Sequence, residues 1–587
     1  MKFKTQIQQK LGPYIQILPA IFNYQIITKV ILAIWLFLLG KIFQALLKSS
    51  GRVAVTSGDW KFLFTTWQGL LILVLGIVSL YVYIAFDLNA MIALCGNLLT
   101  GGKSSIEDCI KNGFDSVRRL NNLRGLLIAV YIALIAPIIG VGISISLTEG
   151  LYIPTFISSV IKGSVLYSAL SGVAVLIFLS VGIANLFILH GIVLDGLPAA
   201  DAGKQSRQMM KANWKDYLKQ NILYILTIAC LLVAVSVVFL FLPLKLISVL
   251  SLPRMIKRLL TVFFVLAGVV ISILADLLSI PMYLFKMTQL YYSYKQGREF
   301  EFKVYERQKH TGIKGAAIFM IIAVIVAAAL VYHQFDQIFP IESNVTIIAH
   351  RAGGIEAPEN TVSGLETAWN LGAYGSEIDI QRTKDGYYVI NHDGTFQRVA
   401  GDKRKPQDMT LKEVKKLSVD GEPVPTIEEM LDASRGRLVL FIELKGKTAD
   451  RKMADDIVNI VKDRQMEEEC VLISLKYDLI DYIETTYPEL QTGFLTFASF
   501  GRTADLNCDY IGLEEESATT DAINSIHKEG KKALVWTANE KASQKFFLCT
   551  KADGLITDNV SQAVDLAEKL QNRSDLDIMV DRIKTVL

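Results

Sequence analysis

Hydrophobic residues are distributed in two different ways along the chain, and the change falls near residue 333. Before this point they form long apolar runs, and after it short β-branched runs alternate with charged segments of helical character. A membrane-spanning helix needs about 20 mostly apolar residues, whereas a buried strand needs only about four to eight. The pattern therefore predicts a multi-span α-helical membrane domain at 1–335, an α/β domain at 340–570 and a C-terminal tail at 571–587.

Seven apolar runs are long enough to be transmembrane helices. The first is the weakest, because Lys41 interrupts it. The predicted spans are Val30–Leu47, Phe62–Phe86, Leu126–Leu147, Leu166–Leu189, Ile222–Leu242, Leu259–Leu284 and Gly315–Tyr332. One span would suffice to tether a domain, so the role of seven spans beyond anchoring stays open.

The charges of the connecting loops predict the orientation of these spans. The N-terminus and every second loop carry 21 Lys and Arg residues, against 8 in the alternate loops. Lys and Arg accumulate on the cytoplasmic side of a membrane. We therefore expect a multi-pass cell-membrane protein with a cytoplasmic N-terminus and, after seven spans, an extracellular C-terminal domain. The amphipathic segments 88–124 and 191–220 are predicted to lie on the inner leaflet as interfacial helices.

The overall composition mainly argues against certain partners and structural features. The net charge is only +3 and basic residues are scattered rather than gathered on one face, so no nucleic-acid partner is indicated. Six cysteines in 587 residues, with no CxxC pair, argue against a disulfide framework and against a zinc site. The oligomeric state cannot be predicted from these features.

The polar half of the chain alternates strand and helix in the manner of a TIM (β/α)8 barrel. The predicted strands are Thr346–Ala349, Ser376–Gln381, Arg437–Leu444, Cys470–Leu475, Thr492–Thr496, Tyr510–Leu513, Lys532–Trp536 and Gly554–Thr557. An additional strand, Tyr387–Asn391, is expected to pair with the second one. Eight strands alternating with helices fit a barrel in number and size. A doubly wound open sheet is the structural alternative.

Three carboxylates fall on the second and third predicted strands of this barrel. Glu377 and Asp379 are two residues apart and so share one face of a strand, and Glu443 ends the next strand. Like charges this close repel one another, and a divalent cation with oxygen ligands, Mg²⁺ or Ca²⁺, is the simplest way to neutralise them. The alternative interpretation is an ion-pair cluster with Lys445 and Arg351.

Two of the six histidines also fall at the predicted barrel rim. His350 ends the first strand, and His392 follows the additional strand. Two imidazoles beside a metal site offer a general base and a general acid near neutral pH. We favour His350 as the base and His392 as the acid, although the sequence barely separates the two roles.

Taken together, these motifs resemble the glycerophosphodiester phosphodiesterase family. The resemblance rests on His350-Arg351-Ala352-Gly353, Ala357-Pro358-Glu359-Asn360-Thr361, Glu377-x-Asp379, Lys384-Asp385-Gly386, His392-Asp393, Glu443-Leu444-Lys445, Trp536-Thr537 and Thr557-Asp558. It covers nearly all of residues 346–570, and the N-terminal half is similar to the multi-span domain of some bacterial members. The family usually has glycine where this chain has Ala352.

The resemblance implies roles for individual residues. Glu377, Asp379 and Glu443 would bind the metal, and His350 and His392 would transfer protons. The residues expected to contact the substrate are Arg351 and Lys445 at the phosphate and Trp536 at the glycerol carbons. Glu359 and Asn360 are expected in the second shell of the metal, where such partners orient the ligands. The family chemistry implies attack by the neighbouring glycerol hydroxyl, giving a cyclic phosphate that water then opens.

The expected function is therefore hydrolysis of glycerophosphodiesters, or of lipid-derived substrates, to glycerol 3-phosphate and an alcohol outside the membrane. Two alternative functions are also enzymatic: a lysophospholipase D-like activity and cleavage of polyglycerolphosphate polymers such as teichoic acids. In a third alternative, the membrane half is a transporter or receptor and the barrel is a binding module.

Overall fold

The computed structural model describes residues 2–56, 61–102, 105–120, 161, 164–297, 300, 312–339, 344–497 and 499–584. The chain forms two compact units. Unit 2 contains Phe43–Gly69 and Asp336–Leu587, and unit 1 contains most of the remaining chain. We describe each unit separately.

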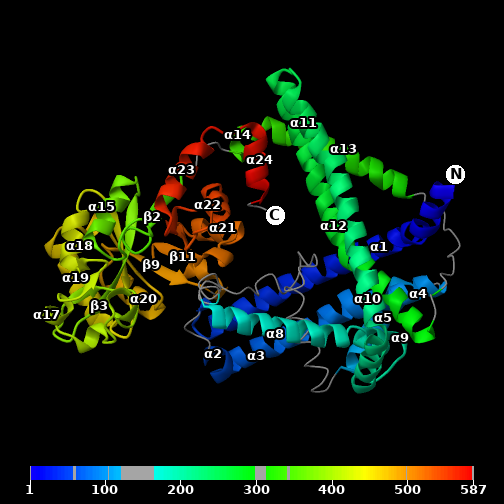
Figure 1. Cartoon of the computed structure of the whole chain (residues 1–587), viewed down its shortest axis with the longest axis horizontal. Helices are drawn as coiled ribbons and strands as arrows, with labels where there is room; N and C mark the ends of the chain where they lie inside the picture. The colour runs from blue at the N-terminus through cyan, green and yellow to red at the C-terminus, as the bar shows by residue number, and fades with distance from the viewer. Residues whose placement is uncertain are drawn as a thin grey trace. The chain divides into compact units, whose positions relative to one another are not determined.

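Unit 2 contains a closed barrel of eight parallel strands surrounded by helices (Figure 1). In spatial order the strands are β2 (Thr346–Ala349), β3 (Gly375–Arg382), β7 (Val439–Leu444), β8 (Cys470–Ser474), β9 (Gln491–Thr496), β11 (Tyr510–Glu514), β12 (Lys532–Trp536) and β13 (Gly554–Thr557). β13 pairs with β2, and β2 pairs with β3, which closes the ring. The predicted TIM barrel is confirmed, and an open sheet is excluded.

Two apolar layers hold the barrel together. The larger layer lies between the strands and the surrounding helices, and a smaller cluster that includes Ile348, Phe441 and Ile556 fills the barrel interior. The helices are α15 (Val362–Asn370), α18 (Ile427–Ser434), α19 (Arg451–Asp463), α20 (Tyr477–Thr486), α21 (Thr520–Lys528), α22 (Lys541–Leu548) and α23 (Val560–Leu570). Burying each large apolar side chain contributes about 1.5–3 kcal/mol to folding.

An insertion follows the second barrel strand. β4 (Tyr388–Ile390) pairs antiparallel with β3, as expected for the additional strand. The chain then forms α16 (Gln397–Ala400), α17 (Leu411–Val414) and the short strands β5 (Ser418–Val419) and β6 (Glu422–Pro423) before α18. A separate apolar cluster, including Phe396, Met409 and Val424, supports this insertion. The insertion carries His392 at its beginning.

A second small sheet joins distant parts of the sequence within unit 2. β1 (Ala54–Thr56), in the segment that follows the first long helix, pairs antiparallel with β10 (Ser499–Gly501), in the loop between β9 and β11. The sequence pattern did not predict this pairing. Both strands are only three residues long, so neither shows a recognisable alternation.

The described part of the N-terminal half contains five helices that are long and apolar enough to cross a membrane. They lie at Ile17–Ser49, Trp67–Thr100, Val165–Leu194, Ala199–Val249 and Arg254–Gln296. Each overlaps one predicted span, and Lys41 does not interrupt α1 (Lys2–Ser49). The predicted last span falls in α13 (Gly312–His333), where Met320–His333 is a shorter apolar helix. The predicted span Leu126–Leu147 lies outside the described residues.

The amphipathic segments and the C-terminus differ in detail from expectation. α5 (Ile106–Arg118) is a separate amphipathic helix that begins at the capping residue Ser105. In contrast, most of segment 191–220 runs without a break into the next apolar stretch as α10 (Ala199–Ser236). The expected tail contains a further helix, α24 (Asp575–Lys584), whose Asp581 pairs with Lys545 and Arg573.

Candidate active site

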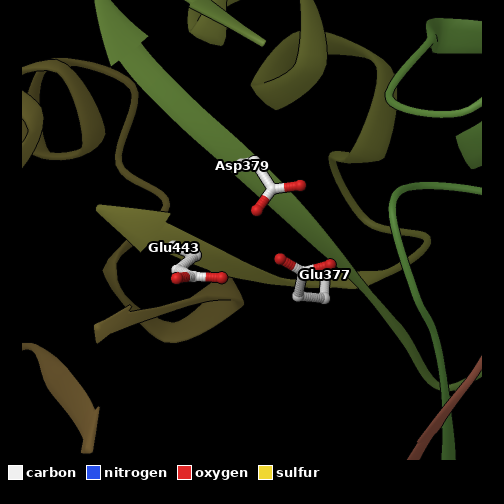
Figure 2. A group of neighbouring side chains, drawn as sticks. All are labelled: Glu377, Asp379 and Glu443. Atoms are coloured by element: carbon white, nitrogen blue, oxygen red, sulfur yellow. The ribbon is translucent and has the colours of Figure 1, made fainter. Parts of the chain in front are cut away.

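Three carboxylates meet at the carboxyl ends of two neighbouring barrel strands. Asp379 on β3 lies opposite Glu443 on β7 in the parallel register, and Glu377 lies two residues earlier on β3. One oxygen from each side chain lies within 4.8 Å of the other two. Figure 2 shows the three carboxylates directed toward one another. All three residues are buried, with exposures of 3%, 1% and 6% for Glu377, Asp379 and Glu443.

The positive charge near this triad does not balance the negative charge of its three carboxylates. Burial, together with the charge of Asp379, raises the pKa of Glu377 to about 8. Burial also raises the pKa of Glu443. Oε1 of Glu377 is buried and has no hydrogen-bond partner among the described residues. A cluster of carboxylate oxygens with one unsatisfied oxygen fits a hard divalent cation, because Mg²⁺ and Ca²⁺ take oxygen ligands.

Lys445 and Asn360 contact both oxygens of Asp379 and one oxygen of Glu443. Lys445 Nζ lies 2.9 Å from Asp379 Oδ1 and 2.9 Å from Glu443 Oε2. Asn360 Nδ2 donates to Asp379 Oδ2 at 2.9 Å. Burial alone would raise the pKa of Asp379, but the charges of Lys445 and His392, together with the hydrogen bonds from Lys445 and Asn360, outweigh it and the pKa is lowered. The alternative ion-pair cluster is thus partly realised through Lys445, whereas the guanidinium of Arg351 contacts Glu359 instead.

His350 is held by a carboxylate that directly follows the last barrel strand, β13. Its Nδ1 donates to Asp558 Oδ1 at 2.6 Å, and its Nε2 lies 3.9 Å from Glu377 Oε2. Asn539 Nδ2 in turn donates to Asp558 Oδ2 at 2.5 Å. Burial acts to lower the pKa of His350, but Asp558 and Glu377 outweigh it and the pKa is raised. This arrangement fixes the ring with Nε2 toward the triad.

His392 has a matching partner on the insertion. Its Nδ1 donates to Asp393 Oδ1 at 2.8 Å. Arg398 Nε donates to the other oxygen of Asp393 at 2.8 Å, and its two terminal nitrogens each donate to Glu359 at 2.7 Å. Burial lowers the pKa of His392 more than the nearby carboxylates raise it. Arg398 therefore links the His392 loop to the loop that carries Glu359.

The loop after β2 places Arg351 beside the triad. The Arg351 amide donates to Glu377 Oε2 at 2.9 Å, and its guanidinium lies 3.4 Å from Glu359 Oε2. Arg351 Nε is buried and has no hydrogen-bond partner among the described residues. Both Arg351 and Ala352 have positive φ values, 51° and 73°. Ala352 thus takes the left-handed conformation at the position where glycine was expected.

Trp536 ends β12 at the same rim. Its Nε1 donates to the carbonyl oxygen of Gly512 at 3.1 Å, and its ring packs partly against the apolar cluster in the barrel interior. One edge of the indole is therefore held by β11, while part of the side chain stays accessible.

Sequence reasoning assigned no role to several residues of this site. Asp393 and Asp558 belong to the motifs quoted above, and their position next to a histidine or at a strand end was a usable signal. Arg398 and Asn539 had no such signal. Each reaches its partner through the fold, Asn539 from a loop that lies 19 residues before Asp558 in the sequence.

Comparison with known proteins identifies the family to which this chain belongs. Residues 350–562 match the Glycerophosphoryl diester phosphodiesterase family, and residues 14–330 match the Membrane domain of glycerophosphoryl diester phosphodiesterase. The second match spans more than half of the chain, which therefore belongs to the glycerophosphoryl diester phosphodiesterases that carry this membrane domain. It is an enzyme that hydrolyses phosphoric diesters, and it is membrane-anchored.

Individual relatives match the catalytic half. The glycerophosphodiester phosphodiesterase of Caldanaerobacter subterraneus is 27% identical over 242 residues, covering 38% of this chain and 98% of the relative. The enzyme of Bacillus altitudinis is 24% identical, covering 38% and 99%. A solved phosphodiesterase of Oleispira antarctica in complex with the product sn-glycerol-3-phosphate is 23% identical and covers 38% of this chain and 96% of that one, with a TM-score of 0.35.

Proposed function

We propose that this enzyme hydrolyses glycerophosphodiesters to glycerol 3-phosphate and an alcohol at the outer face of the membrane, with a divalent cation and two catalytic histidines. The observation that carries the proposal is the convergence at one rim of three buried carboxylates and two histidines whose Nδ1 atoms are each held by an aspartate. A histidine fixed in this way presents Nε2 for proton transfer. The relatives of the catalytic half are named for the same reaction.

Glu377, Asp379 and Glu443 would hold the cation. When bound, a divalent cation at this site would polarise the phosphoryl group and offset its negative charge. Oε1 of Glu377, which is buried and unsatisfied among the described residues, supports this assignment. Adding back Mg²⁺ or Ca²⁺ after metal removal distinguishes the two ions.

The remaining residues bind the phosphate and move protons. Arg351 would bind a phosphate oxygen, supported by its buried Nε that has no partner among the described residues. One histidine would take the proton from the neighbouring glycerol hydroxyl as it attacks phosphorus. The other would donate a proton to the departing alkoxide. Reversal of these roles then allows water to open the cyclic phosphate. Trp536 would pack against the glycerol carbons.

Chain topology supports the outer face. β1 and the barrel pair within one unit, so they lie on the same side of the membrane, and an even number of crossings must separate Ser49 from Thr346. The described helices in this interval supply four candidate spans and the shorter apolar helix Met320–His333. The predicted span Leu126–Leu147 completes an even number. The excess of Lys and Arg in the opposite loops then supports a location of the barrel outside the membrane.

The function is tested with the full-length enzyme purified in detergent. A panel of glycerophosphodiesters, lysophospholipids and polyglycerolphosphate is assayed for glycerol 3-phosphate after metal removal and after adding back Mg²⁺ or Ca²⁺. We expect release from glycerophosphodiesters that depends on the added ion. Turnover that is unaffected by a chelator would refute the metal assignment, and turnover of only lysophospholipid or polymer would reassign the substrate.

The topology is tested with a protease added to intact cells. We expect cleavage of residues 344–584 from outside, with cytoplasmic marker proteins intact. Protection in intact cells and cleavage only in inverted vesicles would place the barrel in the cytoplasm.

A further inference from the structure

The pairing of β1 with β10 joins the catalytic rim to a segment next to the membrane. β10 lies in the loop that follows β9, the fifth barrel strand. In a parallel barrel, the loops that follow the strands all lie at the same end as the active site. The loop that contains β10 is therefore part of the rim that carries His350 and the carboxylate triad.

The contact between the two strands is specific. Ala54, Val55 and Thr56 pair with Gly501, Phe500 and Ser499, and the Arg502 amide donates to the Val53 carbonyl at 3.0 Å. Ala54 and Val55 are buried, with exposures of 4% and 5%.

Gly501 allows the close approach of the two strands. It has a φ of 110°, and a Cβ there would lie 2.7 Å from the carbonyl oxygen of Val53 and 2.9 Å from Leu47 Cδ1. Leu47, in the last turn of α1, is 1% exposed. The rim loop thus contacts both β1 and the end of the first candidate span.

Chain length limits how far this rim can lie from the bilayer. The candidate span Ile17–Ser49 ends five residues before Ala54. Five extended residues reach at most about 18 Å. The next candidate span begins at Trp67, which is 64% exposed, and Phe64 is 67% exposed. Exposed aromatic residues at the ends of spans are typical of the membrane–water interface.

From these contacts we infer that β1 and β10 hold the catalytic mouth at the membrane surface, and that the enzyme acts on glycerophosphodiesters whose alcohol is a lipid held in the bilayer. This inference rests on the proposed hydrolysis. The overall reaction consumes one water, breaks the P–O bond to the lipid alcohol, and leaves a proton on that alcohol. Glycerol 3-phosphate leaves into solution, and the lipid alcohol stays in the membrane.

Cross-linking tests the pairing in the full-length protein. Because Val53 and Arg502 form a hydrogen-bonded pair, the alternation of an antiparallel ladder makes Thr56 and Ser499 a non-hydrogen-bonded pair, whose Cα atoms are about 4.5 Å apart. This separation permits a disulfide. We expect the double variant Thr56→Cys/Ser499→Cys to form it in membranes, detected as a linked peptide pair. Each single variant serves as a control, and failure of the double variant to cross-link would overturn the inference.

Two proline variants test the consequence for the substrate. Val55 belongs to the next hydrogen-bonded pair, so Val55→Pro removes one donor of a hydrogen bond between β1 and β10. The Thr56 N–H points away from β10, so Thr56→Pro leaves these hydrogen bonds intact and serves as the control. The substrates are two diesters of glycerol phosphate, one with a short soluble alcohol and one with a long alkyl alcohol held in phosphatidylcholine vesicles.

The expected pattern separates this inference from the proposed function. Val55→Pro should lower kcat/KM on the vesicle-held diester about tenfold, as expected for the loss of about 1.4 kcal/mol, and leave the soluble diester unchanged. Thr56→Pro should change neither. Equal losses on both substrates, or a wild-type enzyme active only on the soluble diester, would overturn the inference while the proposed function stands. A wild-type enzyme inactive on both diesters would overturn both.

Discussion

The two halves of this enzyme place their apolar side chains in opposite environments. In the barrel, Ile442, Val471 and Ile511 are completely buried by protein. In the membrane half, Leu226 and Phe239 are exposed by 57% and 53%, and at most 39% of the apolar window of any candidate span is buried inside the protein. Similar apolar residues therefore pack against protein in one half and face the bilayer in the other. The length of the apolar run, rather than its composition, distinguishes the two environments.

The largest expected effect comes from substitutions of the three barrel carboxylates, where we expect the chemistry to take place. Glu377→Ala, Asp379→Ala or Glu443→Ala should each reduce activity to background and lower bound metal, because each removes one proposed metal ligand. Membrane insertion should be unchanged. Glu413→Ala, at an exposed carboxylate of α17, is the matched control and should keep full activity. Metal content and thermal unfolding are measured for each variant. A variant that retains a full equivalent of metal would show that its residue is not a ligand.

Removing either of the two proposed catalytic histidines should have the next largest effect. His350→Ala or His392→Ala should slow turnover by about 10²–10⁴-fold, the usual contribution of general acid–base catalysis, with metal content unchanged. His527→Ala, at a barrel histidine that pairs with Asp553, is the control. With an activated aryl leaving group, the variant that lacks the general acid should recover much of its rate. Near-full activity of both variants on a natural diester would disprove proton transfer by these residues.

A pair of truncations tests the contrast between the two environments directly. Ile457→Ala, in the buried face of α19, should destabilise the barrel by about 2–5 kcal/mol, because it leaves a cavity in close-packed protein. Leu226→Ala, at a side chain exposed on α10, should change stability by less than about 0.5 kcal/mol. Protease resistance across a denaturant series measures both. Equal effects would show that the α10 face is packed against protein rather than lipid.

The smallest expected effect concerns Ala352. A left-handed alanine costs about 1–2 kcal/mol, so Ala352→Gly relieves strain. The same change destabilises the protein in two ways. The greater entropy of the unfolded chain costs about 0.4–1 kcal/mol of stability. Loss of a buried methyl group costs about 0.8 kcal/mol. These contributions nearly cancel, and thermal unfolding should therefore change by less than about 1 kcal/mol. Ala352→Val should be clearly more destabilising, since a branched side chain disfavours this conformation.

Much of the fold could be predicted because its patterns are local. Each barrel strand begins and ends within about two residues of its expected position, since β-branched runs bounded by turns indicate buried strands. The β1–β10 pairing could not be predicted, because three-residue strands carry no alternation. The unbroken α10 was also missed, since a polar amphipathic stretch and an apolar span have different periodicity but share one helix.

Part of the candidate site could likewise be predicted from the sequence. Glu377, Asp379 and Glu443 converge as their positions on neighbouring strands indicated. The expected roles of Arg351, Lys445 and Trp536 at the substrate stay predictions, and Lys445 lies between two carboxylates of the triad. Arg398 could not be found from the sequence, because its link between Asp393 and Glu359 depends on how the insertion folds.

The β1–β10 sheet also sets an order of events during synthesis. Ala54 and Gly501 are 447 residues apart in the chain. At about 5–20 residues per second, β1 emerges from the ribosome roughly 20–90 s before its partner exists. Throughout that interval β1 has an unpaired strand edge, and in the proposed topology the sheet can close only after the barrel has crossed the membrane. A segment made early in synthesis is thus among the last to complete its structure.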